Sequence, residues 1–324
     1  MKNILVTGGA GFIGSHLLKH FVNKYPDYNI VNLDILSYAA NISRLEQISS
    51  FKNYKFIKGD INDQDLVKKI LLDYKIDSVI NLAAESHVDN SIKNPNKFAV
   101  VNILGTLNLL NACNSYWVNK KDKLFYHIST DEVYGELGKY GKFNEQTPYN
   151  PKSPYSASKA SSDHLVRAFF HTYRLPFIIS NCSNNYGPDQ HDEKLIPLTI
   201  KKIKENKKIP IYGDGMNIRD WIFVEDHVDA IDKIFHYGEI GETFNIGGEN
   251  EINNLELVKK IIDIADNILK RPKGSSTKLI SFVKDRKGHD FRYAIDNSKI
   301  SKILGWQPQT SFSDGLIKTI RSYI

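Results

Sequence analysis

A glycine-rich segment near the start of the chain, Gly8-Gly9-Ala10-Gly11-Phe12-Ile13-Gly14, follows a short apolar run and opens a stretch with helical spacing. It contains Gly-x-Gly-x-x-Gly at Gly9, Gly11 and Gly14, and Gly-x-x-Gly-x-x-Gly counted from Gly8. Side chains in such a loop would block a pyrophosphate from the helix N-terminus, whose N–H groups and dipole attract anions. In a strand–loop–helix context the pattern predicts a dinucleotide-binding loop.

Strand-like and helix-like segments alternate through the first half of the chain. Apolar runs predict strands at 2–7, 29–33, 54–58, 78–82, 123–129 and 176–180. Helical spacing predicts helices at 11–25, 63–74, 96–117 and 155–174. This βαβ rhythm predicts an α/β fold, a Rossmann-type doubly wound parallel sheet with helices on both faces.

The rhythm changes after Asn181, where turn-rich segments, a helix at 254–269 and a loop at 274–278 are expected. A chain of 324 residues suits one large or two intimate domains. We expect a large nucleotide-binding domain at 1–180, with 219–248 added. A smaller, mainly C-terminal α/β domain, formed by 181–218 and 249–324, would close over it.

Composition excludes several classes of protein. The two cysteines, Cys113 and Cys182, are too few for a disulfide framework or an all-cysteine metal site. No metal site is expected, because the histidines lack metal-ligand spacing. The apolar run Ile4–Val6 is too short for a signal peptide or a membrane span, so a cytoplasmic location without membrane contact is expected.

The net charge of +6 comes from 43 Lys and Arg against 37 Asp and Glu. The lysines are spread along the chain without interleaved aromatic residues, which argues against nucleic-acid binding. A mild positive excess suits a small anionic substrate.

Asp34 ends the second predicted strand, about 20 residues after the last glycine of the loop, where a carboxylate accepts hydrogen bonds from a ribose 2′-hydroxyl. Ile35 follows instead of an arginine, so NAD is favoured over NADP. A turn cap is the alternative role for Asp34. Asp60 and Ile61, after the third strand, would lie under the adenine.

Tyr155 and Lys159 lie four residues apart, on one face of a predicted helix. An ammonium near a tyrosine stabilises the phenolate and lowers a pKa that is normally about 10. Such a tyrosine can remove a proton from a sugar hydroxyl. The spacing alone favours an ordinary helix surface, but together with the glycine loop and Asp34 it favours the catalytic interpretation.

Four longer motifs accompany these residues: Ser129-Thr-Asp-Glu-Val-Tyr-Gly135, Asn181-Cys-Ser-Asn-Asn-Tyr-Gly-Pro188 with Glu193-Lys-Leu-Ile-Pro197, Tyr212-Gly-Asp-Gly-Met-Asn-Ile-Arg-Asp-Trp221, and Gly288-His-Asp-Phe-Arg-Tyr-Ala-Ile-Asp296. With the glycine loop and Tyr155-x-x-x-Lys159, the chain resembles the extended short-chain dehydrogenase/reductase superfamily. Within it, the chain is similar to the dTDP-glucose 4,6-dehydratase family along essentially its whole length.

The resemblance implies a lyase that uses NAD to convert dTDP-glucose to dTDP-4-keto-6-deoxy-glucose and water. Tyr155 would take the 4-hydroxyl proton while NAD takes hydride from carbon 4 and later returns it to carbon 6. Glu132 would remove the carbon-5 proton, and Asp131 would protonate the departing 6-hydroxyl. Thr130 would hydrogen-bond near Tyr155, and Lys159 would also hold the nicotinamide ribose.

The resemblance also implies two sets of binding residues and a homodimer built on the helices at 96–117 and 155–174. The residues expected to bind the cofactor are Gly8, Gly11, Phe12, Ile13, Gly14, Asp34, Asp60, Ile61, Leu82, Ala83, Ala84, Tyr155, Lys159 and Asn185. Those expected to bind the nucleotide sugar, through the smaller domain, are Ser86, Thr130, Asn184, Glu193, Lys194, Leu195, Tyr212, Arg219, Asn254, Arg286, His289 and Tyr293.

The neighbouring acids Asp131 and Glu132 set a geometric condition. Adjacent residues of a strand point to opposite faces, so both acids reach one sugar only if the strand ends near Ser129. Asp131 must also hold a proton near neutral pH, and burial and the like charge of Glu132 favour this.

Three alternatives stay open: a dehydratase for another nucleotide sugar, a nucleotide-sugar 4-epimerase and a non-catalytic NAD-binding protein. An epimerase needs no acid and base for elimination, so Asp131 and Glu132 argue against it. A non-catalytic protein needs neither Tyr155 nor Lys159.

Overall fold

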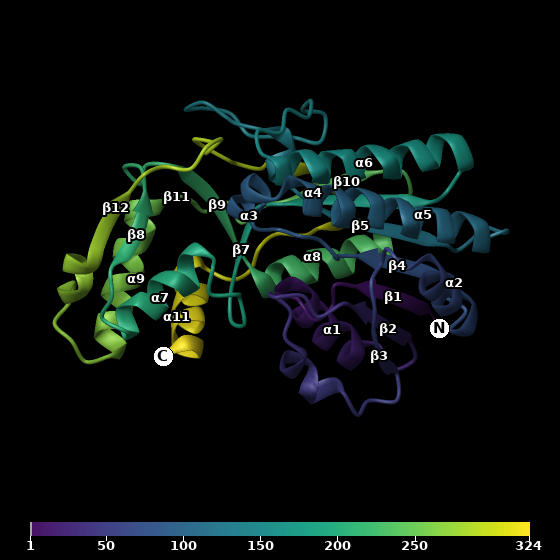
Figure 1. Ribbon diagram of the computed structural model, residues 1–324, viewed down its shortest axis with the longest axis horizontal. Coiled ribbons are helices and arrows are strands. Elements are labelled where there is room, and N and C mark those ends of the chain that lie inside the picture. Colours follow the sequence, from purple (N-terminus) through teal and green to yellow (C-terminus); the bar gives the residue numbers. More distant parts are fainter. Residues whose placement is uncertain (1) are drawn as a thin grey trace.

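The computed structural model describes residues 2–324. A seven-stranded sheet in the order β10-β6-β5-β4-β1-β2-β3 dominates it, at the right of Figure 1. Its strands are β1 (Asn3–Thr7), β2 (Asn29–Asp34), β3 (Tyr54–Lys58), β4 (Ser78–Asn81), β5 (Leu124–Thr130), β6 (Phe177–Cys182) and β10 (Thr243–Ile246). All neighbouring pairs are parallel, which confirms the predicted Rossmann-type fold. The strand order reverses between β1 and β4, the place where such sheets bind ligands.

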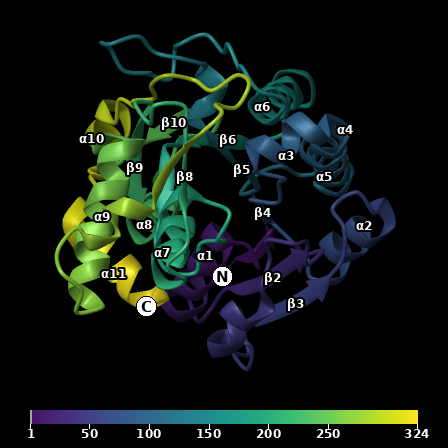
Figure 2. The ribbon, with the colours of Figure 1, turned by 60° about the vertical axis from the view of Figure 1, so that its left-hand side comes forward.

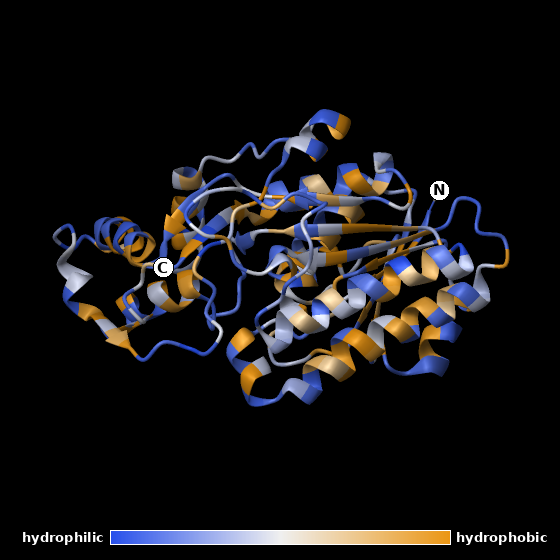
Figure 3. Ribbon diagram, turned by 90° about the horizontal axis from the view of Figure 1, so that it is seen from above, coloured by the Kyte–Doolittle hydropathy of each residue, from blue (hydrophilic) through white to orange (hydrophobic). Residues whose placement is uncertain are grey.

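Helices cover both faces of this sheet because its strands are apolar on both sides. In β1, Ile4 and Val6 belong to one core and Leu5 to the other. Three helices pack on the first core: α1 (Phe12–Lys24), α8 (Val224–Tyr237) and α10 (Ser298–Leu304). Three others pack on the second: α2 (Gln64–Asp73), α5 (Gly105–Tyr116) and α6 (Pro154–Tyr173). Figure 3 shows hydrophobic residues alternating with hydrophilic ones along the helices that flank the sheet.

Two predicted segments differ in detail from the structure. The helix expected at 96–117 is a continuous run of α4 (Pro95–Phe98), the π-helix Ala99–Leu104 and α5. The loop expected at 274–278 is instead a 3-10 helix, Ser275–Leu279. Asp266 stabilises this turn, because its carboxylate accepts hydrogen bonds from the backbone N–H and the hydroxyl of Ser276, at 2.9 and 2.6 Å.

A second body, at the left of Figure 1 and turned forward in Figure 2, has its own core. One sheet has the order β11-β9-β7, and a second pairs β12 with β8. These strands are β7 (Asn184–Tyr186), β8 (Ile209–Tyr212), β9 (Ile218–Phe223), β11 (Glu251–Asn253) and β12 (Ile280–Val283). The accompanying helices are α7 (Leu195–Lys204), α9 (Asn254–Ile268) and α11 (Phe312–Tyr323).

The division into two domains stays a prediction, and the packing favours two adjustments to it. The segment 219–248, expected with the large domain, is split: β9 pairs with β7 and β11, whereas β10 joins the main sheet. Ile300 of α10 and Trp306, expected with the small domain, are buried in the first core under the main sheet. We propose that α10 belongs to the large domain. Within residues 2–324, each helix is too short or too polar to cross a membrane.

Candidate active site

The glycine loop joins β1 to α1 and passes close to the end of β4. Gly8 has a φ of +73°, and a Cβ there would lie 2.7 Å from Cα of Ala83. A Cβ at Gly14 would lie 2.4 Å from the carbonyl oxygen of Gly8. Gly11, which has no side-chain oxygen, is the N-cap of α1. The first N–H groups of the helix therefore remain available to an anion, and the loop fits the pyrophosphate of NAD.

Asp34 lies at the end of β2, where the sequence places it. Its Oδ2 accepts a hydrogen bond from Ala10 N at 2.9 Å, and its Oδ1 accepts one from Leu36 N at 2.7 Å. Burial raises the pKa of this carboxyl, and the two backbone donors oppose that shift. The carboxylate therefore fixes the loop and the following turn, while its remaining lone pairs suit a ribose hydroxyl.

The other residues expected to bind the cofactor differ in how exposed they are to solvent. Leu82 and Ala83 are half-buried and Ala84 is exposed just after β4. The side chain of Ile61 lies in the second core, so only its backbone can face a cofactor. Oδ1 of Asn185 accepts a hydrogen bond from Nδ1 of His227 at 2.8 Å, a partner that the sequence did not indicate. Three more residues are half-buried at or near the loop: Phe12, Ile13 and Asp60.

The acid pair lies in a turn that starts where β5 ends. β5 stops at Thr130, and a 3-10 turn, Asp131–Tyr134, follows. Oγ1 of Thr130 accepts a hydrogen bond from Glu132 N and donates one to Oδ1 of Asp131, both at 3.3 Å. The strand ends within one residue of the expected position, so the alternation of a strand does not separate the two acids.

The surroundings raise the pKa of both acids, but they oppose the rise more at Glu132 than at Asp131. Asp131 is 1% exposed, and burial, then the charges of Glu132 and Asp220, raise its pKa well above the ordinary value. Burial also raises the pKa of Glu132, but Arg286, Lys194 and Arg219 oppose the shift. Asp131 is therefore suited to hold a proton and Glu132 to lose one.

Tyr155 and Lys159 lie in the first turns of α6, which Ser153 and Ser156 cap reciprocally. Nζ of Lys159 donates to the carbonyl oxygen of Ile128 at 2.8 Å and lies 3.2 Å from Nε2 of His127. Burial lowers the pKa of Lys159 to about 8.

The expected effect of Lys159 on Tyr155 is not the dominant one. Burial, followed by the charge of Glu132, raises the pKa of Tyr155 well above its ordinary value, and a hydrogen bond with Thr130 opposes this. The ammonium instead donates to the backbone of β5, at the carbonyl oxygen of Ile128.

Three cations expected to bind substrate gather around Glu132: Lys194, Arg219 and Arg286. The guanidinium of Arg219 lies 4.3 Å over the ring of Tyr293. Nη2 of Arg219 donates to the carbonyl oxygen of Asp290 at 2.9 Å. Positive charge beside the half-buried Glu132 suits an anionic diphosphate.

The outer substrate residues contact partners that are distant in sequence. Tyr38 donates to Oε1 of Glu193 at 3.1 Å, and Lys194 donates to the carbonyl oxygen of Ser86 at 3.0 Å. Tyr212 donates to Oδ2 of Asp89 at 2.9 Å. Tyr38 and Asp89 were not identified in the sequence, because nothing in their local pattern distinguishes them from surface residues.

The remaining expected residues lie in the second body or at its edge. Leu195 packs against the core of this body, which makes a side-chain contact with substrate less favourable there. Nδ1 of His289 lies 2.6 Å from Oδ1 of Asp285, and burial lowers the pKa of His289 to about 4. Asn184 is half-buried in β7, and Asn254 begins α9. In residues 2–324, the His, Cys, Asp and Glu side chains form no group of three or more that could hold a metal ion.

Comparison with known proteins places this geometry in a family. The chain matches the model of the family described as GDP-mannose 4,6 dehydratase over residues 5–319. The dTDP-glucose 4,6-dehydratase of Neisseria gonorrhoeae is 51% identical over 332 residues, covering 100% of this chain and 96% of the relative.

Two solved structures of dTDP-glucose 4,6-dehydratases have the same fold. The enzyme of Bacillus anthracis, solved in complex with NAD, superposes with a TM-score of 0.89 at 43% identity, covering 100% of this chain and 96% of that one. The enzyme of Streptomyces venezuelae, also solved with NAD bound, gives a TM-score of 0.91 at 41% identity, covering 99% and 96%.

Proposed function

The chain belongs to the dTDP-glucose 4,6-dehydratase family, and from this premise we propose how its residues divide the reaction. It is an NAD-dependent lyase that converts dTDP-glucose to dTDP-4-keto-6-deoxy-glucose and water. The observation that best supports the division is the meeting of a buried acid, a second carboxylate and a buried tyrosine around Thr130.

Each residue has one proton to hold or move. Tyr155 accepts the proton of the sugar 4-hydroxyl, with Thr130 as its hydrogen-bond partner. Glu132 removes the carbon-5 proton, which the new ketone acidifies, and gives a proton back to carbon 5 when hydride enters carbon 6. Asp131, kept protonated by burial, gives its proton to the departing 6-hydroxyl. When bound, NAD supplies the hydride acceptor for carbon 4 and the hydride donor for carbon 6.

The binding residues follow the same division. The loop Gly8–Gly14 and Asp34 hold the pyrophosphate and ribose of NAD. The diphosphate of the nucleotide sugar is bound by Lys194, Arg219 and Arg286. These three side chains place positive charge next to Glu132, and this charge attracts the anionic diphosphate.

The experiment that tests this function is incubation of the purified protein with NAD and dTDP-, UDP-, CDP- and GDP-glucose, with 4-keto sugar as the readout. The proposal predicts 4-keto-6-deoxy product from dTDP-glucose above the other three. Preference for another base would identify a different dehydratase, and a 4-epimer without loss of water would identify an epimerase.

The assembly and location of the protein are part of the proposal. We propose a homodimer through the helices at 96–117 and 155–174, since Val100 and Leu104 are 46% and 51% exposed on the first of them. Sedimentation should give the mass of a dimer for the wild type and of a monomer for Leu104→Glu. We also propose a cytoplasmic location, consistent with the unpaired thiols of Cys113 and Cys182, which cell fractionation can test.

A further inference from the structure

Four polar side chains follow one another at four-residue intervals along α6: Tyr155, Lys159, Asp163 and Arg167. This spacing puts them in a row on one side of the helix. Tyr155 and Lys159 belong to the proposed active site, but Asp163 has no part in it. Asp163 is 0% exposed, and a carboxyl at that depth requires strong partners.

Two hydroxyl groups donate to the same oxygen of Asp163. Oγ of Ser129 and the phenol oxygen of Tyr149 each lie 2.9 Å from Oδ2. Burial raises the pKa of Asp163, whereas the charges of Lys159 and Arg167 and these two donors oppose the shift. Donors and cations around a carboxyl stabilise its ionised form.

His127 fills the space between Asp163 and Lys159. Its Nδ1 accepts a hydrogen bond from Nδ2 of Asn81 at 3.1 Å, so the proton of the neutral ring is assigned to Nε2. Nε2 lies 3.4 Å from Oδ1 of Asp163 and 3.2 Å from Nζ of Lys159. Burial, with the charges of Lys159 and Arg167, lowers the pKa of His127 well below its ordinary value. The ring is therefore neutral, and the negative charge of the cluster belongs to Asp163.

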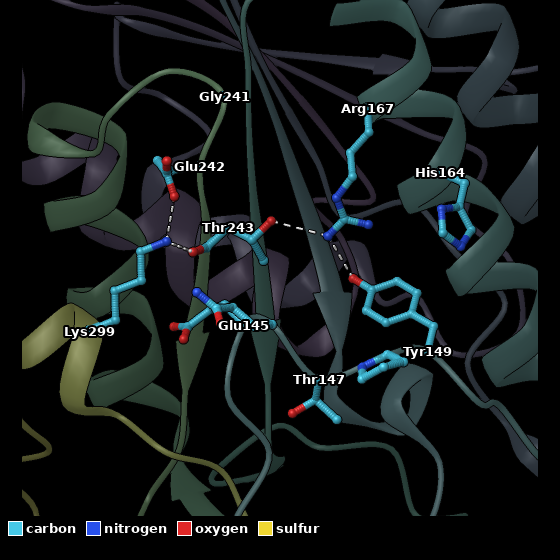
Figure 4. A pocket seen from close by; sticks show the side chains of 11 residues that line it. Glu145, Thr147, Tyr149, His164, Arg167, Gly241, Glu242, Thr243 and Lys299 are labelled. Atoms are coloured by element: carbon cyan, nitrogen blue, oxygen red, sulfur yellow. Dashed lines mark hydrogen bonds and ion pairs between the residues drawn. The ribbon is translucent and has the colours of Figure 1, made fainter. Parts of the chain in front are cut away.

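The other end of the row reaches a pocket of about 370 Å³. Figure 4 shows Arg167 and Tyr149 at this pocket, where Nη2 of Arg167 donates to the hydroxyl of Tyr149 at 2.9 Å and to Oγ1 of Thr243 at 3.1 Å. Arg167 is half-buried, so its charge is partly solvated. Its positive charge favours the ionised form of Asp163.

We propose that Asp163 is a positioning residue whose negative charge keeps Lys159 cationic beside Tyr155 and so sets the upper pH limit of the reaction. This inference rests on the proposed function. Burial lowers the pKa of Lys159 to about 8, and Asp163 is the first of the charges that oppose the fall. The other titratable groups that face this pair are His127, Tyr134, Tyr149, Arg167 and Cys182. Burial raises the pKa of Cys182 to about 12, so its thiol stays neutral over the range of interest.

The test is the pH dependence of kcat for dTDP-glucose in the wild type and in Asp163→Asn, which keeps the size of the side chain and removes its charge. Loss of the ammonium should give the wild type an alkaline limb near pH 8. In Asp163→Asn that limb should lie lower by about 1 pH unit or more, because a nearby opposite charge shifts a pKa by about that amount. KM and the dissociation constant for NAD should change little at pH 6.5. A kcat reduced equally at every pH, with the limb unmoved, would show a structural role only and overturn the inference.

Two further variants separate charge from packing. Tyr149→Phe disturbs the same cluster but keeps the charge of Asp163, so the limb should stay in place; a limb lowered as far as in Asp163→Asn contradicts the inference. Asp163→Glu keeps the charge and changes only the length of the side chain, so the limb should stay where the wild type has it, whereas a limb lowered by about 1 pH unit contradicts the inference. This variant decides the question if Asp163→Asn does not fold. A wild type that forms no 4-keto product would instead refute the proposed function.

Discussion

At the scale of single residues, the chemistry depends on where the protons lie before substrate binds. Asp131 holds one because it is buried beside Glu132 and Asp220. Tyr155 must give one up before it can accept another, and burial opposes that loss. Thr130 links the two groups: its hydroxyl donates to Oδ1 of Asp131 at 3.3 Å, and its presence opposes the rise in the pKa of Tyr155.

Tyr155→Phe removes the proton acceptor and keeps the ring. Loss of a general base typically costs roughly a hundredfold to ten-thousandfold in rate, so kcat should fall by that range. The dissociation constant for substrate should be nearly unchanged, because the nucleotide supplies most contacts. Steady-state rates and calorimetric titration measure the two effects. Tyr149→Phe, a matched loss of a half-buried phenol that donates to Asp163, should retain most of its rate at neutral pH. Near-normal turnover in Tyr155→Phe would refute the assignment.

Asp131→Asn should separate oxidation from elimination. Asparagine keeps the size of the side chain but cannot supply an acidic proton to the departing hydroxyl. Oxidation at carbon 4 uses Tyr155 and Lys159, which are unchanged. A rapid-mixing absorbance trace should therefore show reduced nicotinamide building up, and mass analysis should show a 4-keto-glucose. Normal turnover, or no reduced nicotinamide with both ligands bound, is the contrary result.

The sequence predicted the site residues unequally well. Asp34 and the end of β5 are where the local pattern places them, because strand ends and turn residues are encoded by near neighbours. His127 occupies a core-facing position of β5, and its link to Asp163 depends on how α6 packs on that strand. The four-residue step from Lys159 to Asp163 was visible in the sequence, but only the packing reveals that Asp163 is buried.

At the scale of elements, the loop between β1 and α1 depends on backbone geometry. At Gly8 an alanine would meet the backbone of Ala83 and adopt a φ of +73°. Gly8→Ala should lower the free energy of unfolding by about 1–3 kcal/mol and weaken NAD binding. Gly138→Ala is the control, because a Cβ there has no atom of residues 2–324 within 4 Å. Urea unfolding and NAD titration measure both variants. A Gly8→Ala variant with unchanged stability and unchanged NAD affinity would contradict the role of the loop in binding the pyrophosphate.

A cluster on Asp232 joins helices α1 and α8 on the first face of the sheet. His20, Lys24 and Tyr25 lie 2.7, 2.6 and 2.7 Å from its carboxylate. Burial alone would raise the pKa of Asp232, but these hydrogen bonds and one from His236 outweigh it and lower the pKa below its ordinary value. Asp232→Asn should therefore lose about 1–3 kcal/mol of stability at pH 7.

The pH dependence of that loss has a fixed sign. A carboxyl with a depressed folded-state pKa contributes stability above its unfolded pKa of about 3.9 and loses it as the pH falls through the folded value. The difference between wild type and Asp232→Asn in urea unfolding should thus shrink as the pH drops below about 4. A difference that stays constant down to pH 3 would show that packing, not charge, is responsible.

At the scale of the whole molecule, apolar periodicity was enough to predict the parallel sheet and most of its helices. It was not enough to assign α10, a short amphipathic helix near the C-terminus. Ile300 and Trp306 are buried beneath the main sheet, far along the chain from the strands they contact. The main sheet and the second body both have apolar cores of similar composition. Which of the two cores α10 packs against depends on the path of the chain, which local patterns do not encode.

In the reaction as a whole, one active site oxidises carbon 4, eliminates water and returns the same hydride to carbon 6. The most direct measurement uses dTDP-glucose labelled with deuterium at carbon 4 and locates the label in the product by magnetic resonance and mass spectrometry. The account predicts a 4-keto-6-deoxy sugar with the deuterium in its carbon-6 methyl group. Deuterium returned to carbon 4 of an epimerised sugar, or a 4-keto-6-deoxy product without the label, would contradict it.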